Sequence, residues 1–132
     1  MIKYVPAPDI KFDLESIVKK LGMQNVKLDN VVCMRSYGSA ARYTLARCWG
    51  MPRIWQLALG VPAHYIIEVI SEKYDKLPPH EKEKILIHEV LHIPQQFKGG
   101  LRRHDREKLT PRIGDSHFID QLHTIFKLRS RG

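Results

Sequence analysis

Residues 78–104 have the sequence PPHEKEKILIHEVLHIPQQFKGGLRRH, and this stretch limits how the rest of the chain can be arranged. Two prolines open it, which suits the first turn of a helix because the N–H groups there have no partner within the helix. After two turns the residues become apolar almost all round, a composition typical of a helix buried inside a domain. Pro94 should end this helix near Ile93.

Three polar residues interrupt the apolar part of this predicted helix: His88, Glu89 and His92, in an HExxH pattern. Residues four apart share one helix face, so both imidazoles can bind one metal ion while Glu89 lies beside them. Such groups are costly in an apolar helix unless a partner satisfies them. The pattern predicts one Zn²⁺ per chain held by His88 and His92, with Glu89 as the general base of a peptidase.

A third metal ligand must come from outside this helix. Gly99 and Gly100 allow the chain to turn back sharply, which favours His104 as that ligand. His117, early in the last predicted helix, is the main competitor, because some zinc hydrolases take their third ligand from a following helix. Ligand histidines are usually oriented through their second nitrogen, and three carboxylates are candidates for that role: Asp105, Asp115 and Asp120.

The other elements are predicted from periodicity and turn residues. Residues 9–22 form a helix that Asp9 caps and Gly22 stops. Residues 65–71 (YIIEVIS) alternate as a strand, and residues 53–59 (RIWQLAL) are its expected partner. A last helix starts at residue 115 or 116. Together these predict one α+β domain over residues 1–132.

Composition narrows the class of protein further. The chain has 132 residues and two cysteines in no CxxC pattern, so we expect reduced core thiols rather than disulfides. It contains neither a membrane-spanning apolar run nor the layout of a signal peptide, and we expect a cytoplasmic protein that binds no membrane. The formal net charge of +8 permits nucleic acid, an anionic surface or an acidic substrate as a partner.

Several segments resemble a known family, the small predicted metallopeptidases of archaea and their viruses. The resemblance covers roughly residues 38–105 and rests on GMPRIWQ (50–56), YIIEVIS (65–71), YDKL (74–77), IHEVLHIPQQF (87–97) and GGLRRH (99–104). It implies a zincin-like α+β fold with an N-terminal helix, a small twisted β-sheet, a buried HExxH helix and a C-terminal helix. It also implies His88, His92 and His104 as ligands and Glu89 as the base. Asp105 stands where relatives often have glycine.

Three functions follow from these residues. The first is a zinc peptidase acting on a peptide or protein, with strand 65–71 or its neighbour as the edge that pairs with substrate. Candidate oxyanion donors are Arg102, Arg103, His117 and Tyr43. The second is a nucleic-acid-associated zinc protein, similar to SprT-like proteases, which would use the basic residues Arg102, Arg103, Arg106, Lys108, Arg112, Lys127, Arg129 and Arg131. The third is a metal-binding interaction domain without hydrolytic activity. The oligomeric state is open.

Overall fold

The structure is a computed structural model that describes residues 1–102 and 116–131. It has an α+β architecture in which four strands form one mixed sheet in the order β1-β2-β4-β3. β2 and β4 run parallel at the centre, while β1 and β3 pair antiparallel at the two sides. The strands are β1 (Lys3–Pro6), β2 (Val31–Tyr37), β3 (Ala46–Gly50) and β4 (Tyr65–Ile70).

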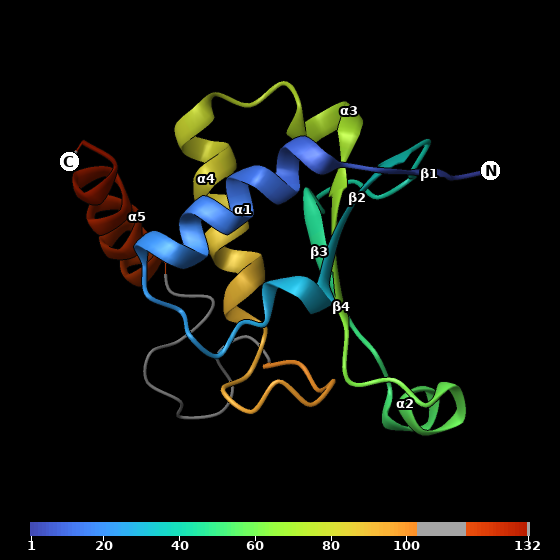
Figure 1. The fold of residues 1–132 in the computed structure, drawn as a ribbon. Helices are drawn as coiled ribbons and strands as arrows, with labels where there is room; N and C mark the ends of the chain where they lie inside the picture. The colour runs from blue at the N-terminus through green and yellow to red at the C-terminus, as the bar shows by residue number, and fades with distance from the viewer. Residues whose placement is uncertain (103–115, 132) are drawn as a thin grey trace.

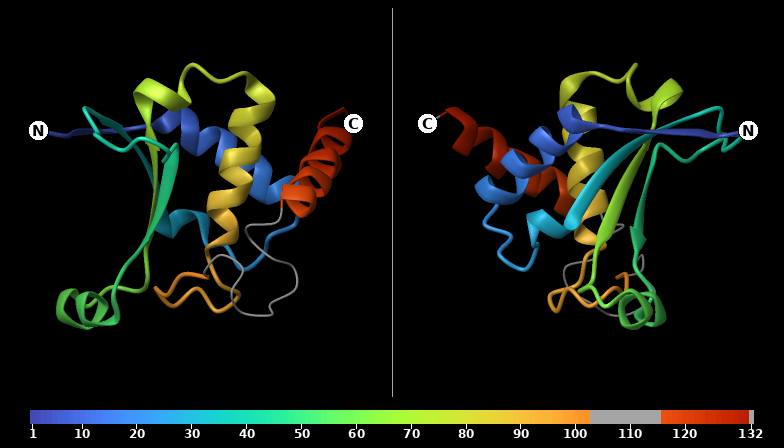
Figure 2. Two further views of the ribbon diagram at one scale, coloured as in Figure 1. Left: turned by 180° about the vertical axis from the view of Figure 1, so that it is seen from behind. Right: turned by 45° about the vertical axis from the view of Figure 1, so that its right-hand side comes forward.

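Helices α1, α4 and α5 lie on the same side of this sheet, as Figures 1 and 2 show. Aliphatic side chains from α1 and α4 pack against the inner face of β4 and form the core. The helical elements are α1 (Pro8–Lys20), a 3-10 turn (Leu28–Asn30), α2 (Arg53–Leu59), α3 (Ser71–Tyr74), α4 (Pro79–Leu91) and α5 (Ser116–Arg131). In the described part of the chain, none of these helices combines the length and the apolarity needed to cross a membrane.

Strand β4 has the alternation that its sequence predicts. Tyr65, Ile67 and Val69 share the face toward the helices and have no exposed surface. On the opposite face Ile66 is exposed, whereas Glu68 is buried because Trp49 and Arg47 of β3 cover it. The strand ends at Ile70 because the next residue begins α3.

The first helix differs from its prediction at its N-terminus. It begins at Pro8 with Ala7 as the N-cap, so Asp9 lies inside the first turn and does not cap the helix. Pro8 suits the first turn because no intrahelical N–H bond is lost there. The Asp9 carboxylate instead accepts two hydrogen bonds from Arg35 at 2.5 and 2.7 Å. The end is as expected, since Gly22 has a left-handed φ of +66°.

The strand predicted at residues 53–59 is wrong, because these residues form helix α2. Pro52 and Gly60 delimit the helix, and Gly60 ends it in the left-handed conformation. The antiparallel partner of β4 is β3, which pairs Cys48 with Ile67. Alternation over so short a segment did not distinguish strand from helix. α2 extends away from the body in Figure 1 and has one buried side chain, that of Gln56.

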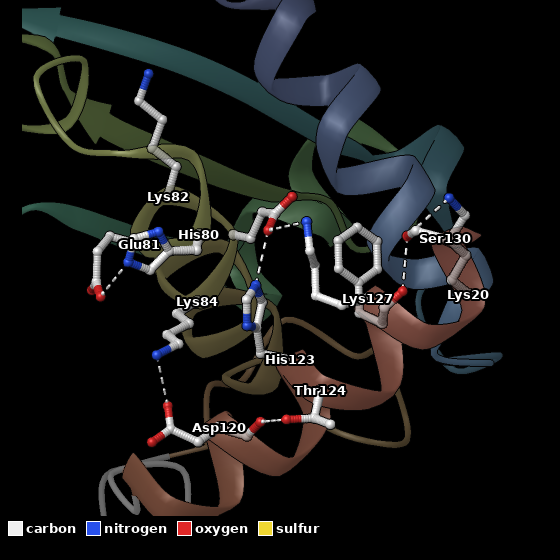
Figure 3. A network of polar contacts seen from close by, with 12 residues as sticks. Lys20, His80, Glu81, Lys82, Lys84, Asp120, His123, Thr124, Lys127 and Ser130 are labelled. Atoms are coloured by element: carbon white, nitrogen blue, oxygen red, sulfur yellow. Dashed lines mark hydrogen bonds and ion pairs between the residues drawn. The ribbon is translucent and has the colours of Figure 1, made fainter.

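The two helices that follow lie where the sequence predicts them, with one shift. α4 begins at Pro79 and ends at Leu91, so His92 is its C-cap and the helix stops two residues before Ile93. α5 begins at Ser116 and packs against α4. Ion pairs tie these two helices together, including Lys84 to Asp120 at 3.1 Å (Figure 3).

Candidate metal centre

His88, Glu89 and His92 gather at the C-terminal end of α4. His88 and Glu89 lie in the last turn, which closes where the N–H of His92 donates to the carbonyl of Glu89 and the N–H of Ile93 to that of Val90. The two imidazole rings meet edge to face, with centroids 5.2 Å apart. One helix end therefore presents two imidazoles, the commonest type of metal ligand, side by side with a carboxyl group next to them.

Glu89 is the buried acid of this group, with 7% of its surface exposed. Burial raises the pKa of its carboxyl to about 7, because the charged form loses its hydration. A carboxyl that titrates near neutrality can both take up and release a proton under physiological conditions. That property is the one required of a general base that later serves as a general acid.

The orientation of His92 is set by the chain that follows it. Its Nδ1 lies 2.6 Å from the carbonyl oxygen of Arg102, and the N–H of Arg102 donates to the carbonyl of His92 at 2.7 Å. A carbonyl oxygen only accepts, so Nδ1 carries the proton and Nε2 is the basic nitrogen of the neutral ring. This backbone contact selects the tautomer that binds a metal through Nε2.

A cleft of about 830 Å³ opens in front of these three side chains. One wall is strand β3 with the residues before it, and the other is α4 with the start of α5. Small side chains, Ala46 and Cys48, line the β3 wall, while Tyr43 at the rim is largely exposed. The cleft is of ordinary ligand size and its surface is mostly apolar, with several charged side chains in the lining.

Cys33 and Cys48 are free thiols, as their spacing predicts. Burial raises the pKa of both thiols to about 12, so both are protonated at neutral pH. A protonated thiol is a poor nucleophile and a poor metal ligand. Cys48 therefore contributes shape to the cleft wall.

The remaining predicted ligands and helpers have different outcomes. His104 lies outside the described residues, as do Arg103, Asp105 and Asp115. His117 is exposed on the first turn of α5, the helix whose Ser116, Ile119 and Asp120 line the cleft. Within residues 1–102 and 116–131, no cluster of three or more His, Cys, Asp or Glu side chains is placed to hold a metal ion. The described residues thus supply two histidines, and a third ligand among them is not seen.

These two histidines fit a metal ion by their chemistry. Their rings are adjacent, one has its tautomer set by a carbonyl, and imidazole suits zinc and other first-row metals. Sequence reasoning missed the β3 wall of the cleft, since residues 53–59 were expected to pair with β4. The alternation in Ala46–Gly50 was the available signal for it.

The basic surface predicted for nucleic acid is described only in part. Of its members, Lys127 lies 3.8 Å from Glu83, and Arg129 donates to the carbonyl of Lys20 at 2.5 Å. Arg103, Arg106, Lys108 and Arg112 lie outside the described residues. Binding of nucleic acid stays a prediction.

Comparison with known proteins decides the family. A family model described as "Putative phage metallopeptidase" matches residues 2–122. The chain belongs to this family. The match spans the whole described site, and membership in the phage metallopeptidase family indicates a metal-dependent peptidase. No match was found among curated proteins or among solved structures.

Proposed function

We propose that this phage metallopeptidase family member is a zincin-like zinc peptidase that hydrolyses peptide bonds. His88, His92 and His104 would hold the ion, and Glu89 would be the general base. The observation that carries the proposal is the position of Glu89, a buried carboxyl with a pKa near 7 beside two histidines at the wall of a peptide-sized cleft. A bound zinc ion supplies Lewis-acid chemistry, polarising a carbonyl and lowering the pKa of water.

The protein's own groups then move protons and position substrate. A Glu89 carboxylate oxygen takes a proton from the attacking water and returns it to the nitrogen of the leaving amine. His92 is oriented for ligation through the carbonyl of Arg102. The walls of the cleft exclude bulk water around Glu89, which is why its carboxyl titrates so high.

Strand β3 is the edge on which we expect an extended substrate to lie. β4 is central in the sheet, so the edge is its neighbour Ala46–Gly50, which lines the cleft. Glu68 holds this edge in place, because its Oε1 accepts from Trp49 Nε1 at 2.8 Å and its Oε2 lies 3.7 Å from Arg47. Among residues 1–102 and 116–131 no further strand pairs with this edge, and an open strand edge beside a catalytic group favours recognition of peptide backbone.

The test is a pair of isosteric substitutions on one helix, Glu89→Gln and Glu83→Gln. Glu89→Gln should keep its zinc, measured by elemental analysis, and lose hydrolysis of an unfolded protein substrate by about 10²- to 10⁴-fold. Glu83→Gln, whose carboxylate pairs with His123, should keep both. Hydrolysis by Glu89→Gln at the wild-type rate would place the base elsewhere.

The third ligand needs a separate comparison, His104→Ala against His117→Ala. We expect His104→Ala to lose most of its zinc while His117→Ala keeps it, because His117 is exposed at the start of α5. The reverse result would show that α5 supplies the ligand and that residues 99–104 do not.

A further inference from the structure

Residues 92–102 form a loop that closes back on His92. The amide and the carbonyl of Arg102 both bond to His92, one to its backbone oxygen and one to its ring Nδ1. Any shift of Arg102 therefore moves the carbonyl oxygen that lies against that ring nitrogen. The question is what holds Arg102 at this position.

The hydroxyl of Tyr65 anchors the loop immediately before Arg102. It accepts from the N–H of Gly99 at 2.8 Å and donates to the carbonyl of Gly100 at 2.7 Å. Tyr65 belongs to the central strand β4 and has no exposed surface, so it cannot follow a loop that moves. Both backbone groups would lose this partner without the hydroxyl, and both hydrogen bonds are partly buried, so the loss destabilises the loop.

A second anchor reaches the loop from α2. The side-chain amide of Gln56 donates to the carbonyls of Met51 and Lys98, both at 2.9 Å. Gln56 is the buried residue of α2, so this helix is joined to the body at the point where it binds the loop. These two hydrogen bonds from one side-chain amide hold the backbone of Lys98 beside Met51, which follows β3.

The loop and the chain that follows β3 approach so closely that there is no room for a side chain at Gly99 or Gly50. A Cβ added at Gly99 would lie 2.2 Å from the carbonyl oxygen of Met51, and one added at Gly50 would lie 2.1 Å from that of Gly99. Gly99 has a φ of +103°, which also excludes most side chains. Phe97, at a left-handed φ of +48°, packs its ring edge-on against Tyr65 with centroids 4.8 Å apart.

We propose that Tyr65 is a positioning residue of the metal centre, acting through residues 99–102 to hold the Arg102 carbonyl against His92 Nδ1. Gln56 supports the same loop from the other side. The proposal rests on the proposed function, because it takes His92 to be a metal ligand. Partners that orient a ligand histidine typically contribute about 10- to 100-fold to metal affinity.

The test compares Tyr65→Phe with Tyr74→Phe. Both tyrosines are fully buried, but the hydroxyl of Tyr74 lies 3.5 Å from the carbonyl of Lys82, in the first half of α4. Zinc affinity is measured by competition with a chelator, on proteins shown to be folded by circular dichroism. Tyr65→Phe should bind zinc about 10-fold more weakly, and Tyr74→Phe within about 2-fold of wild type.

A second readout does not depend on metal. The Nδ1 proton of His92 should give a slowly exchanging, downfield NMR signal in the metal-free wild type, because it bonds to a carbonyl in a half-buried loop. Tyr65→Phe should lose or shift this signal, and Tyr74→Phe should keep it. A merely structural role for the hydroxyl would lower thermal stability without moving the resonance.

The outcomes separate the two proposals. If the wild type binds no zinc, the proposed function fails and the positioning role fails with it. If the wild type binds zinc and Tyr65→Phe matches it in both affinity and the His92 signal, only the positioning role fails. Should Tyr65→Phe not fold, Gln56→Met tests the same loop from α2, with weaker zinc binding expected and unchanged affinity contradicting the proposal.

Discussion

Two groups of histidine and glutamate lie along helix α4, and their surroundings differ. In the first half of the helix, Glu83 lies 2.8 Å from His123 of α5 and 3.8 Å from Lys127, at a partly exposed surface. Figure 3 labels these two partners, His123 and Lys127. At the end of the helix, Glu89 is buried beside His88, and burial raises its pKa to about 7. In the first group the carboxylate of Glu83 has the ammonium of Lys127 nearby. In the second group the carboxyl of Glu89 has lost its hydration, and this loss raises its pKa.

The comparison shows that residue type does not identify a reactive site. Both groups place a glutamate near an imidazole, yet only Glu89 lies in a cleft that can admit a substrate. The Glu83 group joins α4 to α5 and serves the fold. The raised pKa of Glu89 together with the cleft supports the proposal that the second group is the functional one.

The largest expected effect is on metal content. His88→Ala should lower bound zinc from about one ion per chain to a small fraction of that, because two remaining ligands hold zinc poorly. His123→Ala, the matched change in the other group, should leave the content unchanged. Elemental analysis after gel filtration measures both, and equal zinc in the two variants would erase the distinction between the groups.

The next effect is the pH dependence of the metal-free protein. Because the folded pKa of Glu89 is raised from 4.5 to about 7, the folded state holds that proton more tightly than the unfolded state does. This contribution to the free energy of unfolding is full below pH 4.5 and falls as pH rises through 7, by up to about 3 kcal/mol. Urea unfolding in chelator should show this decline in the wild type.

Glu89→Gln is the control for that decline. The variant has no carboxyl to titrate, so its free energy of unfolding should fall less between pH 5 and pH 8 than that of the wild type. Glu83→Gln should keep the wild-type slope. A wild-type slope in Glu89→Gln would mean that another group is responsible for the decline.

A smaller effect is expected where the group is structural. His123→Ala removes the close partner of Glu83, whose side chain is 24% exposed, and should lower the free energy of unfolding by about 1 kcal/mol. Peptidase activity should not change, since His123 lies outside the cleft-lining residues. Urea unfolding measures the loss of stability, and a hydrolysis assay on the same preparation measures the activity. A loss of activity in the folded variant would count against the division between the groups.

The smallest effect is that of Lys127→Ala. The ammonium lies 3.8 Å from Glu83 and its side chain is 49% exposed, so solvent screens the pair. We expect the free energy of unfolding to change by less than about 0.5 kcal/mol. A larger loss, measured by urea unfolding, would show that Lys127 supports Glu83 more than its exposure suggests.

Local patterns predicted much of this fold. The prolines at 78–79 and 94 delimit α4 to within two residues, and the alternation from Tyr65 onward predicts β4 with its buried face. The N-cap at Asp9 and the strand at 53–59 are wrong for one common reason. Short segments satisfy more than one local pattern, and distant contacts, such as that of Asp9 with Arg35, decide between them.

The sequence by itself determined the pair of histidines, because i and i+4 residues of a helix are neighbours whatever the rest of the chain does. Only the tertiary structure decided the pKa of Glu89, the β3 wall of the cleft and the loop that orients His92. Burial depends on which elements pack over a residue, and the Tyr65 and Gly99 groups that bond to each other are 34 residues apart. Such long-range contacts produce no periodic pattern in the sequence, since they form only once the chain has folded.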